Sequence, residues 1–101
     1  MKPRLLATAL CLAAAAGAAA AQDPNLARNL AASCANCHGT NGKAVAGSGM
    51  ATLAGVDKDR LLQHIRDFKS GVKPATIMHQ IAKGYSDEQM ALIAGYFAAQ
   101  K

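Results

Sequence analysis

The sequence predicts an all-α fold. Apolar residues recur at helical spacing in several separate stretches, and residues that begin or end helices bound each stretch. No stretch alternates apolar and polar residues for long enough to indicate a strand, and no internal repeat is visible. We therefore expect one small helical domain and no second domain.

The first 21 residues are expected to be a targeting segment and not part of the fold. Two basic residues precede a short, alanine-rich apolar run, and small residues at Ala19 and Ala21 suit cleavage before Gln22. The run is too short for a convincing membrane span. We therefore expect a signal peptide over residues 1–21, a domain over residues 22–101 with no membrane span, and a periplasmic protein.

Composition limits what this domain can do. Without the signal peptide, nine basic side chains remain against six acidic ones, and most are interleaved with acids along the chain. This pattern does not predict a nucleic-acid-binding surface. Four aromatic side chains and no tryptophan make a marginal core for so short a domain. A large apolar cofactor would supply the missing buried area.

The first helix is expected to begin at Asp23 and Pro24, as an N-cap followed by proline in the first turn. One face of this helix would carry Leu26, Leu30, Ser33, Cys34 and Cys37. The helix therefore runs into a pair of cysteines. Five glycines between Gly39 and Gly55, without periodicity, predict a loop that wraps closely around a bound group.

Three further helices are expected. Asp57 predicts the N-cap of the next helix and Gly71 its left-handed end. Its apolar stripe consists of Leu61, Leu62, Ile65 and Phe68. A short helix is expected over residues 76–83, and Ser86 with Gln89 predicts a capping box on the last helix. One face of that helix carries Met90, Ile93, Ala94 and Phe97.

The motif C-A-N-C-H at residues 34–38 is compatible with four kinds of chemistry. A thioredoxin-like redox pair belongs at the start of a helix, where the dipole favours a thiolate, whereas this pair ends one. A zinc site needs a fourth ligand, for which His64 and His79 are the candidates, and a tetrahedron built partly from adjacent residues. A structural disulfide leaves the histidine unused.

Covalent attachment of a c-type haem uses every residue of the motif. Cys34 and Cys37 lie three positions apart, so both sulfurs fall on one side of a helical turn and can form thioethers along one porphyrin edge. The adjacent His38 then reaches the iron. We therefore predict one covalent haem c.

A haem that carries electrons normally has a second axial ligand, and methionine opposite histidine suits this role. Met90 is expected in the core, and Met50 is expected on the same side of the ring as His38. Met78 lies on a segment that can fold over the opposite face, which makes it the predicted ligand. The neighbouring His79 is expected to point away toward solvent.

These residues together resemble a class I c-type cytochrome over the whole of residues 22–101. The resemblance rests on C-A-N-C-H, on T-L-A-G at 52–55, on Met78 and on G-Y-S-D-E-Q-M-A-L-I-A-G-Y-F-A at 84–98. The last third is similar to the haem subunits of flavocytochrome c sulfide dehydrogenases. In that group the sixth ligand is the methionine eight residues before the serine of the S-D-E cap, which corresponds to Met78.

The resemblance implies that the first and last helices cross beside the haem. The residues that should meet at the crossing are Leu26 and Leu30 with Ile93, Ala94 and Phe97. In the family, a proline before the T-L-A-G element supplies a carbonyl that accepts a hydrogen bond from the second ring nitrogen of the histidine. Ala51 stands at that position in this chain.

We therefore expect a periplasmic monohaem protein that transfers electrons and has no substrate chemistry of its own. His38 and Met78 would fill both axial positions, and Lys43 and Lys73 are candidates for a basic rim around the exposed haem edge. The resemblance implies that electrons come from a sulfide-oxidising flavoprotein, so the chain could be the cytochrome subunit of a sulfide dehydrogenase complex.

Two alternatives remain open. The first is a free shuttle to a terminal oxidase or another cytochrome, which predicts a charged rim and a salt-sensitive rate. A tightly docked subunit instead predicts an apolar docking patch. The second alternative is a haem enzyme or gas sensor, which needs a vacant or labile sixth position.

Overall fold

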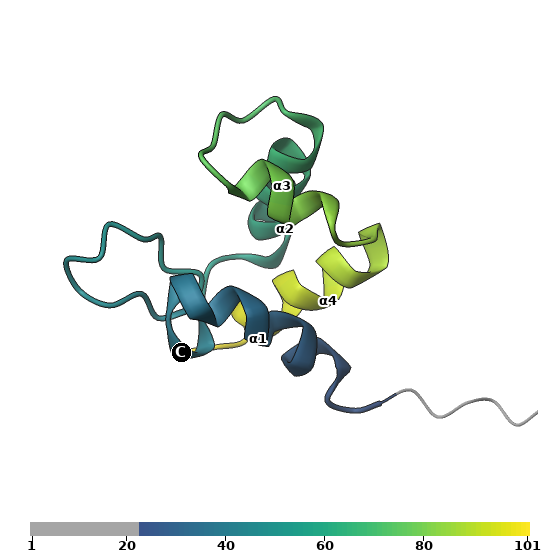
Figure 1. Cartoon of the computed structure of the whole chain (residues 1–101). Coiled ribbons are helices and arrows are strands. Elements are labelled where there is room, and N and C mark those ends of the chain that lie inside the picture. Colours follow the sequence, from purple (N-terminus) through teal and green to yellow (C-terminus); the bar gives the residue numbers. More distant parts are fainter. Residues whose placement is uncertain (1–22) are drawn as a thin grey trace, which may run out of the picture.

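The computed structural model describes residues 23–101, and its regular structure is helical (Figure 1). The elements are α1 (Leu26–His38), the 3₁₀ turn η1 (Thr40–Gly42), α2 (Lys58–Ser70), α3 (Met78–Lys83) and α4 (Asp87–Ala98). No strand occurs in this part of the chain, so the all-α prediction is confirmed. None of the helices between residues 23 and 101 is long and apolar enough to span a bilayer. The expected signal peptide lies outside the described residues, and its removal stays a prediction.

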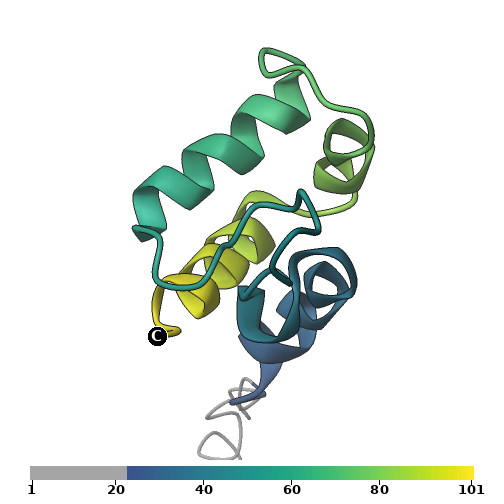
Figure 2. The ribbon, with the colours of Figure 1, turned by 90° about the vertical axis from the view of Figure 1, so that its left-hand side faces the viewer.

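The helices form two pairs. α1 packs against α4, α3 packs against α2, and α2 also contacts α4. Figures 1 and 2 show α2 and α3 together in the upper part of the molecule, with α1 and α4 below them. The loops before and after α2 extend away from the helices (Figure 1). This arrangement leaves room for a bound group between the two pairs.

The core lies where α1, α2 and α4 meet. It consists of Ala31, Leu61, Ile93, Ala94 and Phe97, and Leu30 packs against it. The predicted packing of the first helix on the last is thus confirmed, with Leu30 and Ala31 at the contact, whereas Leu26 is not part of this core. Met90 is completely buried, as the helical pattern of α4 predicts.

The start of α1 differs from the sequence prediction. Asn25 is the residue before the helix, and no side chain caps it. The Asp23 carboxylate accepts a hydrogen bond from the Asn25 backbone amide at 2.8 Å and one from the Asn29 side chain at 3.3 Å. Asp23 therefore closes a turn on its own backbone, and the helix starts after that turn.

The ends of α2 and α4 agree with the sequence. The Asp57 side chain accepts a hydrogen bond from the backbone of Arg60, and Gly71 adopts the left-handed conformation at the end of α2. Ser86 and Gln89 bond each other's backbone amides at 3.1 and 2.9 Å, forming the predicted capping box. Each signal depends on neighbouring residues alone, which explains why the sequence shows it.

The short helix α3 begins two residues later than expected. Ile77 has φ −137° and ψ −26°, outside the helical range, so the first helical residue is Met78 and not Thr76. This start places Met78 at the end of α3 that follows the loop from α2.

The glycine-rich segment is fastened at both ends. The Gly42 carbonyl accepts hydrogen bonds from the amides of Leu53 and Ala54 at 2.8 and 3.1 Å. The Gly55 amide donates to the Phe97 carbonyl of α4 at 2.9 Å. The predicted loop is confirmed, and it contains the turn η1, which is too short to give a periodic signal.

Candidate haem site

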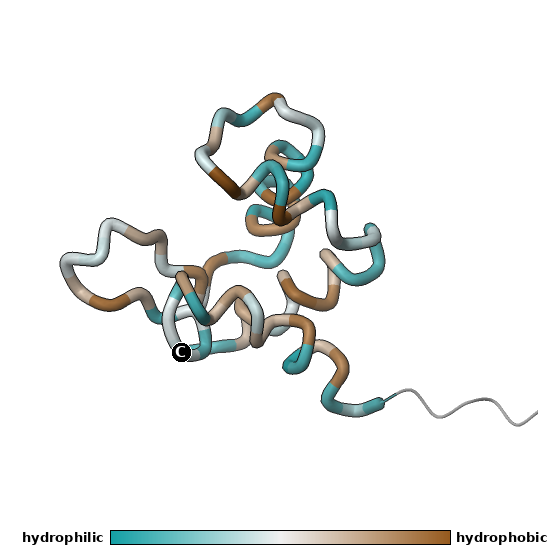
Figure 3. The backbone as a smooth tube through the Cα atoms, viewed as in Figure 1, coloured by the Kyte–Doolittle hydropathy of each residue, from teal (hydrophilic) through white to brown (hydrophobic). Residues whose placement is uncertain are grey.

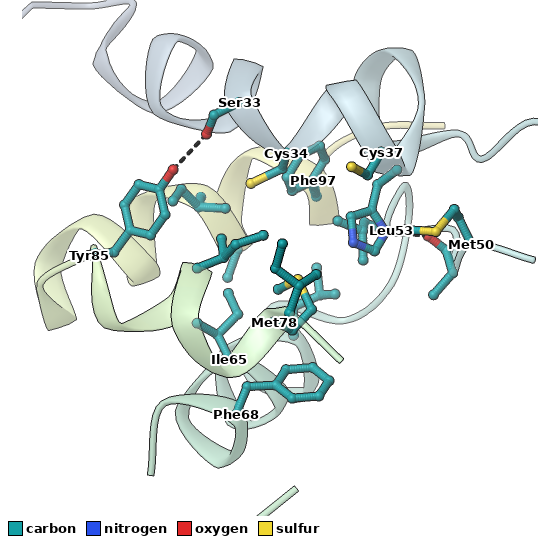
Figure 4. A pocket seen from close by; sticks show the side chains of 18 of the residues that line it. Ser33, Cys34, Cys37, Met50, Leu53, Ile65, Phe68, Met78, Tyr85 and Phe97 are labelled. Atoms are coloured by element: carbon teal, nitrogen blue, oxygen red, sulfur yellow. Dashed lines mark hydrogen bonds between the residues drawn. The ribbon is translucent and has the colours of Figure 1, made fainter. Parts of the chain in front are cut away.

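A cavity of about 790 Å³ lies between the two helix pairs. Figure 4 shows that Cys34 and Cys37 reach it from α1, whereas Met78 reaches it from α3. Most of its other lining is apolar and includes Leu53, Leu61, Ile65, Phe68, Ile81 and Phe97. A volume of this size lies within the range of pockets that hold drug-sized ligands and cofactors.

The end of α1 carries the two thiols and the imidazole. Cys34 is half-buried, Cys37 is exposed, and neither forms a disulfide. His38 is the last residue of the helix and is buried. The chain turns sharply after it, because Gly39 has φ 85° and any side chain there would overlap the carbonyl of Lys43. The motif is therefore presented at an abrupt helix end.

The ring of His38 is held from behind by Ala51. The Nδ1 atom lies 2.6 Å from the Ala51 carbonyl oxygen, which can only accept, so Nδ1 carries a proton and donates it. In the neutral ring Nε2 then has a lone pair available for a metal. The expected main-chain acceptor is present although alanine replaces the proline of the family pattern.

Two methionines line the cavity, and a third does not. Met78 lies at the start of α3, while Met50 precedes Ala51 in the glycine-rich loop and therefore lies on the His38 side. Met90 is buried in the core and does not line the cavity. The structure thus brings the predicted residues Cys34, Cys37, His38 and Met78 to one cavity.

The other two histidines do not contribute to this site. His64 accepts a hydrogen bond at Nδ1 from the Lys73 ammonium, at 3.1 Å. His79 does not line the cavity, and the expectation that it points to solvent is partly wrong because its Nδ1 is buried without a partner. Within residues 23–101, no group of three or more His, Cys, Asp or Glu side chains converges to hold a metal. This observation argues against the zinc alternative.

The environment of Cys34 also argues against thiol-redox chemistry. Burial raises the pKa of the Cys34 thiol, and the neighbouring Ser33 side chain opposes this effect only in part. A reactive cysteine needs a lowered pKa, because the thiolate is the nucleophile. The environment of Cys34 therefore lacks the lowered thiol pKa of a redox-active cysteine.

Of the two lysines expected at the rim, only one lines the cavity. Lys73 lies beside it, with its ammonium 4.9 Å from the ring centroid of Phe68 and bonded to His64. Lys43 is exposed on the glycine-rich loop and is not part of the lining. Tyr85 also lines the cavity, and the sequence patterns did not single it out because it falls outside the apolar stripes.

Comparison with known proteins agrees with this geometry. The chain matches the family model of cytochrome c over residues 14–100. It belongs to the cytochrome c family. The cytochrome is 40% identical over 68 residues to the cytochrome subunit of sulfide dehydrogenase from Chlorobaculum tepidum, covering 67% of this chain and 60% of that protein.

Two further relatives are an electron acceptor of thiosulfate dehydrogenase and a cytochrome c4. The thiosulfate dehydrogenase electron acceptor of Stutzerimonas stutzeri is 38% identical over 69 residues, covering 68% of this chain and 32% of the relative. Cytochrome c4 of Pseudomonas aeruginosa is 39% identical over 90 residues, which cover 89% of this chain and 42% of that protein. The matched segment is therefore shorter than two thirds of each of these relatives.

The site fits the cofactor of the family. Two thiols on one helical face, a buried imidazole with Nε2 free and an apolar cavity between two helix pairs are what a covalent haem requires. The cytochrome binds one haem c through Cys34 and Cys37, and one of its relatives is an electron acceptor of thiosulfate dehydrogenase.

Proposed function

We propose that this cytochrome carries single electrons between two periplasmic redox proteins, with His38 and Met78 as the axial ligands of its haem iron. The observation that carries this proposal is that one apolar cavity has an imidazole on the α1 side and a thioether on the α3 side. The haem supplies one-electron chemistry between the ferric and ferrous states, and this chain makes and breaks no bond during transfer.

The surrounding residues favour a carrier over an enzyme or gas sensor. His38 is oriented by the Ala51 carbonyl, and Met78 begins a helix that packs on α2. Two ligands held in this way exclude water and small molecules from the iron. They also limit the movement that accompanies a change of charge, which suits repeated electron transfer.

The rim of the cavity favours a docked complex over a free shuttle. The large apolar side chains that are most exposed among residues 23–101 are Val45 (71%), Met50 (40%), Val72 (78%) and Ile77 (58%). All four lie on the two loops beside the cavity, and Met50 and Ile77 also line it. Figure 3 shows brown, hydrophobic positions along both of these loops. Exposed apolar residues gathered around one opening are typical of an interaction surface.

We infer that the donor docking on these loops is a flavoprotein that oxidises sulfide. The likeness to the cytochrome subunit of sulfide dehydrogenase supports this partner. Lys73 is the one expected rim lysine that lines the cavity, and a hydrogen bond to His64 fixes the position of its ammonium. Sulfide would lose its electrons at the flavoprotein, and this chain would accept them one at a time.

The axial assignment is tested with the haem-loaded protein. Met78→Ala should abolish the methionine-to-iron charge-transfer band of the ferric form and allow the ferrous form to bind carbon monoxide. Met50→Ala is the matched control, because it removes the other cavity methionine, and it should keep the band. A wild-type protein that is high-spin and binds carbon monoxide readily would overturn the carrier function.

The docking proposal is tested by measuring the affinity for the flavoprotein and the rate of haem reduction by sulfide in its presence. Val72→Asp should weaken binding roughly ten- to a hundredfold, because an exposed valine that becomes buried contributes on the order of 1.5–3 kcal/mol and about 1.4 kcal/mol corresponds to tenfold. Lys43→Glu, a charge change away from the cavity lining, should have less effect. A dominant effect of Lys43→Glu, with a rate that falls steeply as salt increases, would support the shuttle instead.

A further inference from the structure

Tyr85 connects two helices at the edge of the cavity. It lies between α3 and α4, and it lines the cavity together with Ser33 of α1. Its hydroxyl oxygen is 2.6 Å from Ser33 Oγ, although the two residues are 52 positions apart in the chain (Figure 4). Its carbonyl oxygen accepts a hydrogen bond from the Lys69 ammonium of α2 at 2.7 Å. One residue is thus held by α1 at its side chain and by α2 at its backbone.

The direction of the hydroxyl pair follows from a second contact of Ser33. Ser33 Oγ donates to the Leu30 carbonyl of the same helix at 3.1 Å. Because a serine hydroxyl has one proton, Tyr85 is then the donor to Ser33 Oγ. Tyr85→Phe removes this donor and keeps the ring that packs beside the cavity.

The hydrogen bond between Tyr85 and Ser33 joins α1 to the part of the chain that follows α3. In the part of the chain that the structure describes, it is the only hydrogen bond from α1 to residues 56–101. The other long-range bond of α1 joins His38 to Ala51, on the glycine-rich loop. α1 packs extensively on α4 but not on α3, since the cavity lies between them. The pair Ser33–Tyr85 therefore ties α1 directly to the chain that leaves α3.

We propose that Tyr85 is a positioning residue whose hydroxyl, bonded to Ser33, holds α3 close enough to α1 for Met78 to keep its place on the haem iron. The proposal rests on the axial role proposed for Met78. Met78 is the first residue of the six-residue helix α3, and Tyr85 lies two residues beyond its last residue, so a restraint at Tyr85 limits movement of the whole short helix. Without the restraint, a competing small ligand should replace Met78 more easily.

The experiment measures how well imidazole displaces Met78 in the ferric, haem-loaded protein, followed by loss of the charge-transfer band. Tyr85→Phe should raise the apparent affinity for imidazole roughly two- to tenfold, the range expected when one partly exposed hydrogen bond is lost. Ser33→Ala should have a similar effect. The double variant should behave like either single variant, because both substitutions delete the same bond.

Tyr96→Phe is the matched control. The Tyr96 hydroxyl donates to Asn41 Oδ1 at 2.7 Å, so the substitution deletes the same kind of bond, but this bond joins α4 to η1 outside the haem cavity. Its imidazole affinity should equal that of the wild type even if its denaturation midpoint falls. A general loss of stability would therefore not imitate the effect expected for Tyr85.

Three results would overturn the positioning role: an unchanged imidazole affinity in Tyr85→Phe, an equal increase in Tyr96→Phe, or additive effects of Ser33→Ala and Tyr85→Phe. If Tyr85→Phe does not load haem, the imidazole affinity of Ser33→Ala tests the positioning role instead. Ser33 is exposed, so its truncation should not prevent folding. Failure of the axial assignment would be visible separately, as a charge-transfer band that survives in Met78→Ala.

Discussion

Replacing Gly42 by alanine tests how the glycine-rich loop is built around the haem site. Gly42 is buried and has φ 79°, a conformation that L side chains rarely adopt. A methyl group there would lie 2.6 Å from Cδ1 of Phe97 and 3.0 Å from the amide nitrogen of Ala54. Phe97 is buried in the core, so its ring has little space in which to move away.

The expected loss of stability has two parts. The left-handed conformation costs a residue with a Cβ roughly 1–2 kcal/mol. Overpacking against a fixed neighbour adds typically about 1–3 kcal/mol. Gly42→Ala should therefore lower the free energy of unfolding by about 2–5 kcal/mol.

Gly47→Ala provides a matched control within the same loop. Gly47 has φ 77°, but nothing lies within 4 Å of the position that a Cβ would occupy. Only the conformational part applies, so the expected loss is about 1–2 kcal/mol. The comparison between the two variants isolates the contact with Phe97.

The assay is guanidinium unfolding of the haem-loaded protein, followed by circular dichroism. Midpoints can be compared directly if the slope of the transition is unchanged. Gly42→Ala should unfold at a clearly lower concentration than Gly47→Ala. Equal midpoints would refute the reasoning, because they would mean that a methyl group at position 42 does not collide with Phe97.

Three further substitutions probe the site and its support. Ala51→Pro should stabilise the protein by about 0.4–1 kcal/mol in the same unfolding assay, because the carbonyl that holds His38 remains and the described residues give the Ala51 amide no acceptor. A weakened or destabilised haem site in that variant would show that the local backbone does not suit proline. Ser86→Ala should lose about 1 kcal/mol through its capping box, and no loss in thermal or chemical unfolding would contradict the cap. Met90→Ala should lose about 2–5 kcal/mol yet keep the charge-transfer band, and loss of the band would contradict its place in the core.

The helix ends show where sequence signals are reliable. Asp57, Gly71 and the pair Ser86–Gln89 were predictable because each cap depends on contacts between residues at most three positions apart. The start of α1 was not predictable in this way, because the carboxylate of Asp23 can either cap a helix or close a turn. It closes the turn before the helix, and composition alone does not distinguish this use from a helix cap.

The haem attachment site was predictable from the amino-acid sequence, because the chemistry of C-A-N-C-H depends on contiguous residues whose spacing is visible in the chain. The sequence also ranked Met78 above the other methionines from its place after the histidine and from family resemblance. Two contacts became visible only in the folded chain: the Ala51 carbonyl reaches His38, and Tyr85 bonds Ser33 at the cavity edge. These contacts join residues 13 and 52 positions apart. They arise only when helix packing and loop closure bring the partners together, and no local pattern in the chain records that distance.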